Sequence, residues 1–236
     1  MYKSQKIYAI IPARSGSKGV KNKNIANIGG IPMIAHTIKS ALSSNYIDRV
    51  IVSTDSKEYA DISRSFGAEV PFLRPSNISK DYSTDTDFFL HLIKWLENNE
   101  NYCPEYLVHL RPTTPIRDKK VIDSAIKNFI GSGYSALRSI HKMSDTSYKT
   151  FEIEENKLKM INSNNFDIEK TTLPRQSFPS TYDPNGYIDI VKKSNIVSGF
   201  IHGSKVMPFL TKKTYEVDEI EDLEYIKYLF KIGKNS

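Results

Sequence analysis

The sequence predicts one α/β domain with a mostly parallel sheet, interrupted by a small insertion in its second half. Short apolar runs alternate along the chain with segments whose apolar residues recur at helical spacing, a pattern typical of layered parallel sheets. A length of 236 residues is enough to bury a sizeable core and suits a single domain, residues 1–236. The alternation is lost only between residues 141 and 182, which we expect to form a small inserted segment.

In the first half of the chain, local signals predict four strands and four helices. An apolar run from Ile7 forms the first strand, and Pro32 suits the first turn of the first helix. Ser56 caps the next helix and Gly67 ends it. The expected helices cover residues 33–42, 57–66, 88–96 and 119–130, and the later strands cover residues 49–54, 106–110 and 135–140.

The segment from His141 to Tyr182 breaks this rhythm. Residues 147–153 and 157–161 resemble the two strands of a hairpin, and residues 162–172 are polar and irregular. The core of such a segment is too small for independent folding, so we expect it to close over a site as a lid or to pack on a second subunit. The remaining elements are strands at 186–191 and 206–210 and an amphipathic helix at 220–230.

Composition excludes several classes of protein. The formal net charge of +6 favours anionic ligands, but the lysines are dispersed, and neither a basic stripe nor a known nucleic-acid module is visible. The single cysteine, Cys103, leaves no internal disulfide and indicates a reducing cytoplasm. No apolar run reaches membrane length, and the first run lacks a signal-peptide cleavage site. We therefore expect a cytoplasmic protein that binds neither nucleic acid nor membranes.

The most informative stretch is a basic loop that follows the first strand. Gly16 and Gly19 permit positive φ and close backbone approach, so successive N–H groups can converge on an anion. Four cations lie within ten positions of the loop: Arg14, Lys18, Lys21 and Lys23. Because open α/β sheets bind ligands at the carboxyl ends of their strands, the loop predicts a polyphosphate site, the alternative being a solvated basic turn. It matches neither the Walker pattern nor the dinucleotide-binding fingerprint.

Two carboxylates near the C-terminus form the candidate metal site. Glu216 and Asp218 are two positions apart, so in an extended segment both project from one face. Mg²⁺ prefers a few carboxylates together with phosphate and water, a set that a bound nucleotide would complete. Acidic residues ahead of a helix also serve as caps and dipole partners, and this second interpretation stays open at the sequence level.

The basic loop is one of several motifs that follow one another in a distinctive order. They lie at residues 11–24, 51–55, 73–85, 110–117, 174–176, 184–186 and 216–223. Together they resemble the acylneuraminate cytidylyltransferases, the CMP-sialic acid synthetase group, over nearly the whole chain. The resemblance implies a Rossmann-like nucleotidyltransferase domain. It also implies transfer of CMP from CTP to an acidic sugar, a nonulosonic or related 3-deoxy-2-ulosonic acid, with release of pyrophosphate, for surface glycan biosynthesis.

The resemblance assigns the nucleotide half of the site. Arg14, Lys18 and Lys23 would act as the catalytic residues by binding and neutralising the triphosphate of CTP, and Arg74 would read cytosine. The nucleotide-binding residues are Ala13, Arg14, Ser17, Lys18, Lys23, Asn24, Arg74, Ser83, Thr84 and Asp85. Glu216 and Asp218 would hold Mg²⁺ as the cofactor, although the family has Asp where this chain has Glu216.

The resemblance also implies an acceptor-sugar site shared across a homodimer. The substrate-binding residues are Arg111, Lys149, Arg175, Gln176, Asn185, Tyr187 and Asp189. Lys149 and Arg175 occupy positions from which, in the family, a partner subunit reaches the acceptor. The segment 141–182 is therefore expected to mediate dimerisation.

Three positions of the acceptor half depart from the family's pattern. Arg111 stands in place of glutamine, Asp183 in place of arginine, and Asp189 in place of an aromatic residue for which Tyr187 can substitute by a shift. His202, in a turn near this region, is a further candidate for contact with the acceptor. These changes predict an acceptor other than N-acetylneuraminate, richer in hydroxyl or amino groups. The alternatives are a nucleotidyltransferase for a sugar phosphate or phosphonate, and a nucleotide-sugar-binding protein without turnover.

Overall fold

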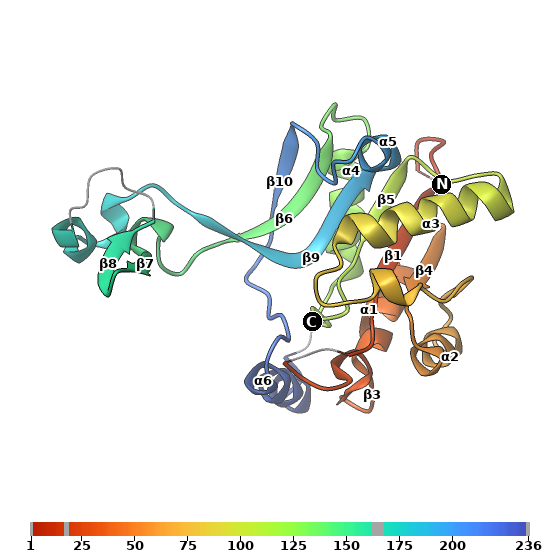
Figure 1. The fold of residues 1–236 in the computed structure, drawn as a ribbon, viewed down its shortest axis with the longest axis horizontal. Helices are drawn as coiled ribbons and strands as arrows, with labels where there is room; N and C mark the ends of the chain where they lie inside the picture. Colours follow the sequence, from red (N-terminus) through yellow and green to blue (C-terminus); the bar gives the residue numbers. More distant parts are fainter. Residues whose placement is uncertain (1, 17–18, 162–167, 235–236) are drawn as a thin grey trace.

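The computed structural model of the protein describes residues 2–16, 19–161 and 168–234. Within those residues, a six-stranded sheet has the order β10–β6–β9–β5–β1–β4 (Figure 1). Its strands are β1 (Ile7–Pro12), β4 (Arg49–Ser53), β5 (Tyr106–His109), β6 (Ala136–Lys142), β9 (Tyr182–Lys192) and β10 (Val206–Leu210). Five strands of this sheet run in one direction, and β9 runs against both of its neighbours. The mostly parallel α/β sheet expected from the sequence is confirmed.

Helices cover both faces of this sheet. They are α1 (Met33–Leu42), α2 (Lys57–Ser65), α3 (Asp85–Glu100), α4 (Lys119–Phe129), α5 (Lys193–Val197) and α6 (Ile220–Lys231). Alternate residues of β1 point to opposite faces of the sheet and belong to two separate apolar clusters. Ile7 and Ile11 pack with α1, α2 and α4, whereas Tyr8 and Ile10 pack with α3 and α5. In the described part of the chain, none of these helices is both long enough and apolar enough to cross a membrane.

A third apolar cluster anchors the last helix beside the beginning of the chain. Leu223, Ile226 and Leu229 of α6 pack with Ile28 of β2 (Asn27–Ile28), which pairs with β3 (Ile31–Pro32). Because the segment that precedes α6 must run past the basic loop to reach this cluster, residues some 200 positions apart in sequence become neighbours.

Side-chain hydrogen bonds from Ser56 and Thr84 cap the N-terminal ends of α2 and α3. Ser56 accepts from the backbone N–H of Tyr59, as the sequence predicts. Thr84 and Asp87 form a reciprocal capping box, so α3 begins at residue 85, three positions earlier than its apolar spacing indicates. This earlier start places the first turn of α3 at the carboxyl ends of β1 and β5.

One expectation for the second half of the chain is wrong in detail. Residues 147–149 form a 3-10 turn, so the hairpin consists of β7 (Phe151–Glu154) and β8 (Lys157–Met160) around a two-residue turn. Glu155 and Asn156 have φ values of 50° and 63°, as this type of tight turn requires. Strand β9 is antiparallel because the chain returns to the sheet directly from the insertion, without the crossover that a parallel strand needs.

The inserted segment forms an arm that projects away from the body (Figure 1). The ends of β6 and β9 pair with each other at its base, and the β7–β8 hairpin lies near its tip. Short 3-10 helices, Ile168–Thr172 and Arg175–Ser177, complete the described part of the arm. Its apolar side chains are poorly covered, and Ile153 is 77% exposed. The arm therefore offers apolar surface that the body of the same chain leaves uncovered.

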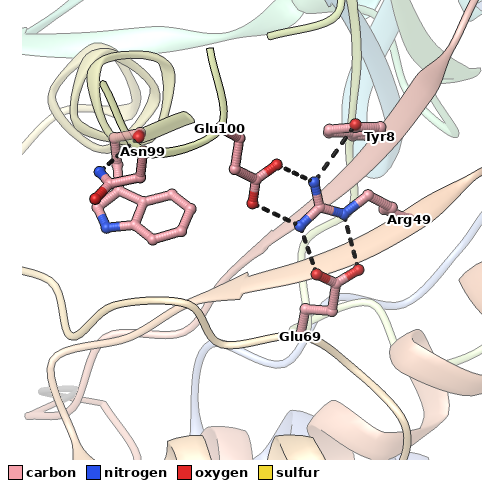
Figure 2. Close-up of polar contacts among 6 residues, drawn as sticks. Tyr8, Arg49, Glu69, Asn99 and Glu100 are labelled. Atoms are coloured by element: carbon pink, nitrogen blue, oxygen red, sulfur yellow. Dashed lines mark hydrogen bonds and ion pairs between the residues drawn. The ribbon is translucent and has the colours of Figure 1, made fainter. Parts of the chain in front are cut away.

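An ion-pair network holds the opposite end of the sheet. Figure 2 shows the Arg49 guanidinium at the start of β4, between the carboxylates of Glu69 and Glu100. It donates to Glu69 from Nε at 2.9 Å, to Glu100 from Nη2 at 3.0 Å and to the Tyr8 hydroxyl from Nη1 at 3.4 Å. The network thereby ties β1 and β4 to the C-terminal end of α3, far from the carboxyl ends of the strands.

Candidate active site

A cavity of about 450 Å³ opens where β1 and β5 end. Its described lining brings together four cationic and four anionic side chains from distant parts of the chain. The cations are Arg14, Lys23, Arg74 and Arg111, and the anions are Asp81, Asp85, Glu216 and Asp218. We call this the main cavity. Its position agrees with the expectation that ligands bind at the carboxyl ends of parallel strands.

The basic loop is held in place from both of its ends. The carboxylate of Asp55 accepts from the backbone N–H and the hydroxyl of Ser15, at 2.7 and 2.6 Å. Gly16 has a φ of +74°, the positive value that the sequence predicts. Gly19 approaches the acidic segment so closely that a Cβ there would overlap the backbone oxygen of Asp218. Ser17 and Lys18, two of the predicted nucleotide-binding residues, lie outside the described residues.

The other predicted triphosphate-binding residues are already engaged with oxygen atoms of the chain. Arg14 donates to Asp81 at 2.7 Å. Lys23 donates to the carbonyl of Val217 at 2.9 Å and to Asp218 at 3.1 Å. To bind an anion, Arg14 and Lys23 would therefore exchange these oxygen partners for oxygen atoms of the anion.

Two predicted residues of this loop support it from beneath. The side chain of Ala13 is fully buried, and its backbone N–H bonds to the carbonyl of Ser53, so Ala13 belongs to the core and contributes by placing Arg14. Asn24 is also buried and donates to the carbonyl of Arg14 at 3.1 Å. Its side-chain oxygen has no hydrogen-bond partner among the described residues.

Arg74 forms the back wall of the main cavity. It is only 6% exposed, donates from Nε to the hydroxyl of Ser53 at 3.1 Å and lies 5.3 Å from the ring centre of Phe88. Burial lowers the pKa of Arg74 to about 10, which leaves it charged at neutral pH. Ser83 and Thr84 line the adjacent wall, where α3 begins. A cation, an aromatic ring and two hydroxyls thus face the space predicted to hold cytosine and ribose.

Asp85 and Arg111 form an ion pair at the edge of the main cavity, with Nη2 of Arg111 2.6 Å from the Asp85 carboxylate. Burial raises the pKa of Asp85, but the charges of His109 and Arg111 and the hydrogen bond from Arg111 hold it below its usual value. Burial also lowers the pKa of His109 to about 3. Because His109 is then neutral at neutral pH, Arg111 is the cation that pairs with the Asp85 carboxylate there.

The candidate metal ligands both face the main cavity. Glu216 accepts from the hydroxyl of Thr113 at 2.8 Å, and Val217 between the two carboxylates is fully buried. The alternation places Glu216 and Asp218 on one face of an extended segment, as the sequence predicts. Neither of these two residues caps α6, because Glu219 and Asp222 form its capping box.

The donor set fits a magnesium ion that shares its coordination with substrate. No three His, Cys, Asp or Glu side chains of the described residues are grouped closely enough to cage a metal by themselves. Mg²⁺ typically takes one or two protein carboxylates together with substrate phosphates and water. Glu216 and Asp218, beside the cations of the basic loop, meet that requirement.

Two of the predicted acceptor residues on β9, Asp189 and Tyr187, lie in different surroundings. Asp189 is 6% exposed, and burial raises the pKa of its carboxyl to about 6. Tyr187 lies apart from the main cavity: it packs with Ile188 and lines a second cavity of about 770 Å³. Its hydroxyl accepts from the backbone N–H of Asp118 at 2.6 Å. Tyr187 therefore does not stand in for the aromatic that Asp189 replaces.

An irregularity in β9 explains this difference. Two residues spaced i and i+2 on a regular strand share a face, but the register of β9 against β6 shifts between Arg138 and Ile140. Gly186, with a φ of +60°, lies in the irregular stretch, and a Cβ there would come within 3.1 Å of Arg111. Asn185 donates to Thr211 at 2.7 Å and so holds the strand instead of facing the main cavity.

The predicted acceptor residues of the arm do not line the main cavity of their own chain. Arg175 donates to the carbonyl of Ser144 at 2.8 Å, and the Lys149 ammonium lies 5.7 Å from the ring centre of Phe178. Arg175 and Gln176 line a separate cavity of about 470 Å³ on the arm. One chain alone therefore does not assemble all of the predicted acceptor residues.

Sequence reasoning did not assign three residues that line the main cavity. Asp81 pairs with Arg14, Phe88 lies under Arg74, and Thr113 bonds to Glu216. Asp81 and Thr113 lie within recognised motifs, which was an available signal. Phe88 shows only the apolar spacing of a core residue, and nothing in the sequence connects Thr113 to a residue 103 positions away.

Comparison with known proteins shows what this chain is similar to. The family described as cytidylyltransferase matches residues 8–235. The pseudaminic acid cytidylyltransferase of Campylobacter jejuni is 28% identical over 96% of this chain and 97% of its own length. The CMP-N,N'-diacetyllegionaminic acid synthase of the same species is 30% identical over 96% and 95%. The N-acylneuraminate cytidylyltransferase of Escherichia coli is 31% identical over 93% of this chain and 51% of its own length.

Solved structures show the same fold. A CMP:2-keto-3-deoxy-manno-octonic acid synthetase complexed with CTP superposes with a TM-score of 0.71 at 16% identity, covering 97% of this chain and 99% of that one. A 4-diphosphocytidyl-2C-methyl-D-erythritol synthase superposes with a TM-score of 0.68 at 11% identity, covering 96% and 99%. At such identities these likenesses support the architecture alone.

Proposed function

The chain belongs to the cytidylyltransferase family, and we propose that it transfers CMP from CTP to the hydroxyl of an acidic sugar, a nonulosonic or related 3-deoxy-2-ulosonic acid, releasing pyrophosphate. The observation that carries the proposal is the main cavity itself, where Glu216 and Asp218 face Arg14 and Lys23. A nucleotidyl transfer needs cations for the triphosphate and carboxylates for a metal in the same place.

In this proposal the basic loop holds the triphosphate. Arg14 and Lys23 exchange their present carboxylate partners for phosphate oxygens, and Lys18 and Ser17 contribute from the loop. The same cations stabilise the negative charge that builds up on the leaving pyrophosphate. Arg74 binds cytosine, and Ser83 and Thr84 bind the base and ribose at the start of α3.

Enzymes of this family generally use a divalent metal, and here we propose Mg²⁺. Glu216 and Asp218 would hold it, with Thr113 orienting Glu216 through its hydroxyl and Lys23 balancing the charge of Asp218. When bound, the ion would polarise the α-phosphate and lower the pKa of the acceptor hydroxyl. Among the described residues that line the main cavity, we assign no side chain as general base.

On the acceptor side, Arg111 is the cation placed to bind the carboxylate of the sugar in bidentate fashion. Its guanidinium would then divide its N–H donors between that carboxylate and Asp85. The names of the relatives support an acidic sugar as acceptor. The activated sugar would then enter the assembly of a surface glycan.

The arm supports a proposal that two chains form the active dimer. Its exposed apolar residues need a covering surface, and Lys149 and Arg175 are left without access to the main cavity of their own chain. We expect these cations to reach the cavity of the partner subunit. Light scattering should give twice the chain mass, and a monomer at assay concentration would contradict the arrangement.

A mixing experiment tests whether the dimer shares its sites. An Arg175→Ala variant and a Glu216→Ala variant should each be nearly inactive alone. Mixed dimers would contain one site with both residues intact, so co-expression should restore about a quarter of the wild-type activity. Absence of any restoration, with mixed dimers isolated, would show that each chain works alone.

The reaction itself is tested by pyrophosphate release. CTP should be the preferred donor among the four common NTPs in the presence of an ulosonic acid and Mg²⁺. Faster turnover with UTP or GTP would contradict the assignment of Arg74 to cytosine. Turnover only with a sugar phosphate or phosphonate would favour the alternative acceptor class, and CTP binding without any turnover would favour a non-catalytic protein.

A further inference from the structure

A buried arginine joins three segments of the chain. Arg117 follows β5, is 8% exposed and does not line the main cavity. Its guanidinium donates to five oxygen atoms. They are the backbone carbonyls of Arg111 at 2.6 Å, Gly186 at 2.9 Å, Tyr187 at 2.7 Å and Thr114, and the hydroxyl of Thr37 at 2.8 Å. The loop after β5, strand β9 and helix α1 therefore meet at this one side chain.

The guanidinium of Arg117 uses all of its donors. An arginine carries five N–H groups in a rigid planar fork, and here Nε has one partner and Nη1 and Nη2 have two each. In the described part of the chain all five partners are uncharged. Burial lowers the pKa of Arg117 to about 9, which leaves it charged at neutral pH. Because a buried cation without an ion-pair partner is costly, the five bonds that it makes, and not its packing, are what explain this residue.

The turn that Arg117 holds carries a contact of the candidate metal site. Arg117 bonds to the first and the last carbonyl of turn 111–114. Inside that turn, Thr113 binds the acidic segment twice: its hydroxyl donates to Glu216 at 2.8 Å, and its carbonyl accepts from the backbone N–H of Val217 at 2.8 Å. A displacement of the turn would therefore displace Glu216 as well.

The part of β9 that Arg117 holds lies between the two halves of the site. A Cβ at Gly186 would come within 3.1 Å of the Arg111 side chain and within 3.4 Å of the Glu216 carboxylate. Arg111 is the cation proposed for the acceptor, and Glu216 is a proposed metal ligand. Since the carbonyl of Gly186 accepts from Arg117, one guanidinium fixes both the turn and the strand against which these two side chains lie.

We propose that Arg117 is a positioning residue for the transfer. By holding turn 111–114 against β9, it sets the distance between Arg111, which binds the acceptor, and Glu216, which binds the metal. The inference rests on the proposed cytidylyl transfer and adds to it a residue that contacts neither substrate. In-line transfer depends on how the two reactants are aligned, and a misplacement on the order of 1 Å costs about 100-fold in rate.

Arg117→Met tests the inference, because methionine has a similar length and no donors. It should lower kcat at least about 30-fold and raise the KM for an acidic acceptor sugar about tenfold. A binding measurement by calorimetry is independent of turnover. The affinity for CTP in EDTA should stay within about twofold of wild type, because Arg14, Lys23 and Arg74 belong to other segments. The gain in CTP affinity on adding Mg²⁺ should fall at least about threefold.

Chemical rescue separates the guanidinium from its charge. Arg117→Ala removes the equivalent of ethylguanidinium, and Arg117 also lines a cavity of about 340 Å³ between α1 and α6, through which a small ion can enter. Ethylguanidinium should restore kcat of Arg117→Ala about tenfold, whereas ethylammonium should not, because it cannot reproduce the planar fork. For the same reason Arg117→Lys should keep a kcat about tenfold below wild type. Recovery of the thermal unfolding midpoint by ethylguanidinium without recovery of kcat would overturn the inference.

Arg49→Met is the matched control. Arg49 also donates through its guanidinium to several oxygen atoms, but at the opposite end of the sheet (Figure 2). Its substitution should lower the urea midpoint and leave kcat, the KM for the acceptor and the Mg²⁺-dependent gain in CTP affinity within about twofold of wild type. A purely structural Arg117 would give the same profile as Arg49→Met.

Wild-type kcat and acceptor KM in folded Arg117→Met would overturn the inference and leave the cytidylyl transfer intact. If Arg117→Met does not fold, Arg117→Lys and Thr37→Val decide, since the second removes only one partner of the guanidinium. Wild-type kinetics in both would overturn the inference. If the wild-type chain binds CTP but releases no pyrophosphate with any acidic sugar, the proposed function fails and the positioning role with it.

Discussion

Replacing Gly19 with alanine tests whether the basic loop works by closing onto the acidic segment. A Cβ at Gly19 would overlap the backbone oxygen of Asp218. The substitution therefore adds a steric conflict between the basic loop and the acidic segment. The loop and the acidic segment must then separate, which moves Lys23 and Asp218 away from their common site.

The size of the effect follows from this overlap. Restoring an ordinary contact requires a displacement on the order of 1 Å, and a misplacement of that size between reacting groups costs about 100-fold in rate. This corresponds to about 3 kcal/mol of transition-state stabilisation. The stability of the chain should fall by only about 1–3 kcal/mol, as for other overpacked sites.

The measurement is kcat/KM for CTP at saturating acceptor and Mg²⁺, together with urea unfolding. Gly30→Ala is the matched control: Gly30 has a φ of +91°, and a Cβ there meets nothing within 4 Å. Its substitution should cost about 1 kcal/mol of stability and leave the rate unchanged. Wild-type kcat/KM in Gly19→Ala would refute the close approach of loop and acidic segment as a requirement for activity.

Four other substitutions have expected outcomes. Glu216→Gln and Asp218→Asn should each lower kcat at least about 100-fold and raise the Mg²⁺ concentration needed for half-maximal rate, and an unchanged Mg²⁺ titration would contradict their role as ligands. Burial raises the pKa of Asp189 from 3.8 to about 6. The contribution of its protonated carboxyl to the free energy of unfolding is therefore complete below about pH 4 and is lost as the pH rises through 6. Asp189→Asn should remove that slope from urea unfolding measured across this range. The hydrogen bond from Arg49 lowers the pKa of Glu100 below 4.5, so this stabilisation is present above pH 4.5 and is lost on acidification. Glu100→Gln should abolish that acid dependence without changing kcat, and a changed kcat would contradict the purely structural role of this network.

Most of the secondary structure was predictable because its signals are local. Ser56 caps α2, and the apolar spacing of residues 33–42 and 220–230 corresponds to helices in the structure. Alternation around Val217 was enough to place Glu216 and Asp218 on one face. The detail that failed, the extended conformation expected at residues 147–149, depends on a contact with another segment, because the backbone N–H of Ser147 donates to Thr181.

Part of the candidate site was predictable as well. The motif order led to the cations and carboxylates that the main cavity brings together. Tyr187 shows where such reasoning stops: two positions from Asp189, it shares a face with that residue only if the strand is regular. The irregular pairing of β9 with β6 turns Tyr187 toward a different cavity.

The sequence by itself determined the alternation of strands and helices, the basic loop after the first strand and the family to which its motifs point. Each of these depends on residues close together in the chain, where capping, apolar periodicity and turn chemistry act. Only the tertiary structure decided that Gly19 meets Asp218, that Thr113 orients Glu216, and that His109, Asp189 and Arg138 stand in one row. Those contacts join segments about 50 to 200 positions apart, and their geometry arises from strand register, the irregularity in β9 and the packing of α6, which no local pattern encodes.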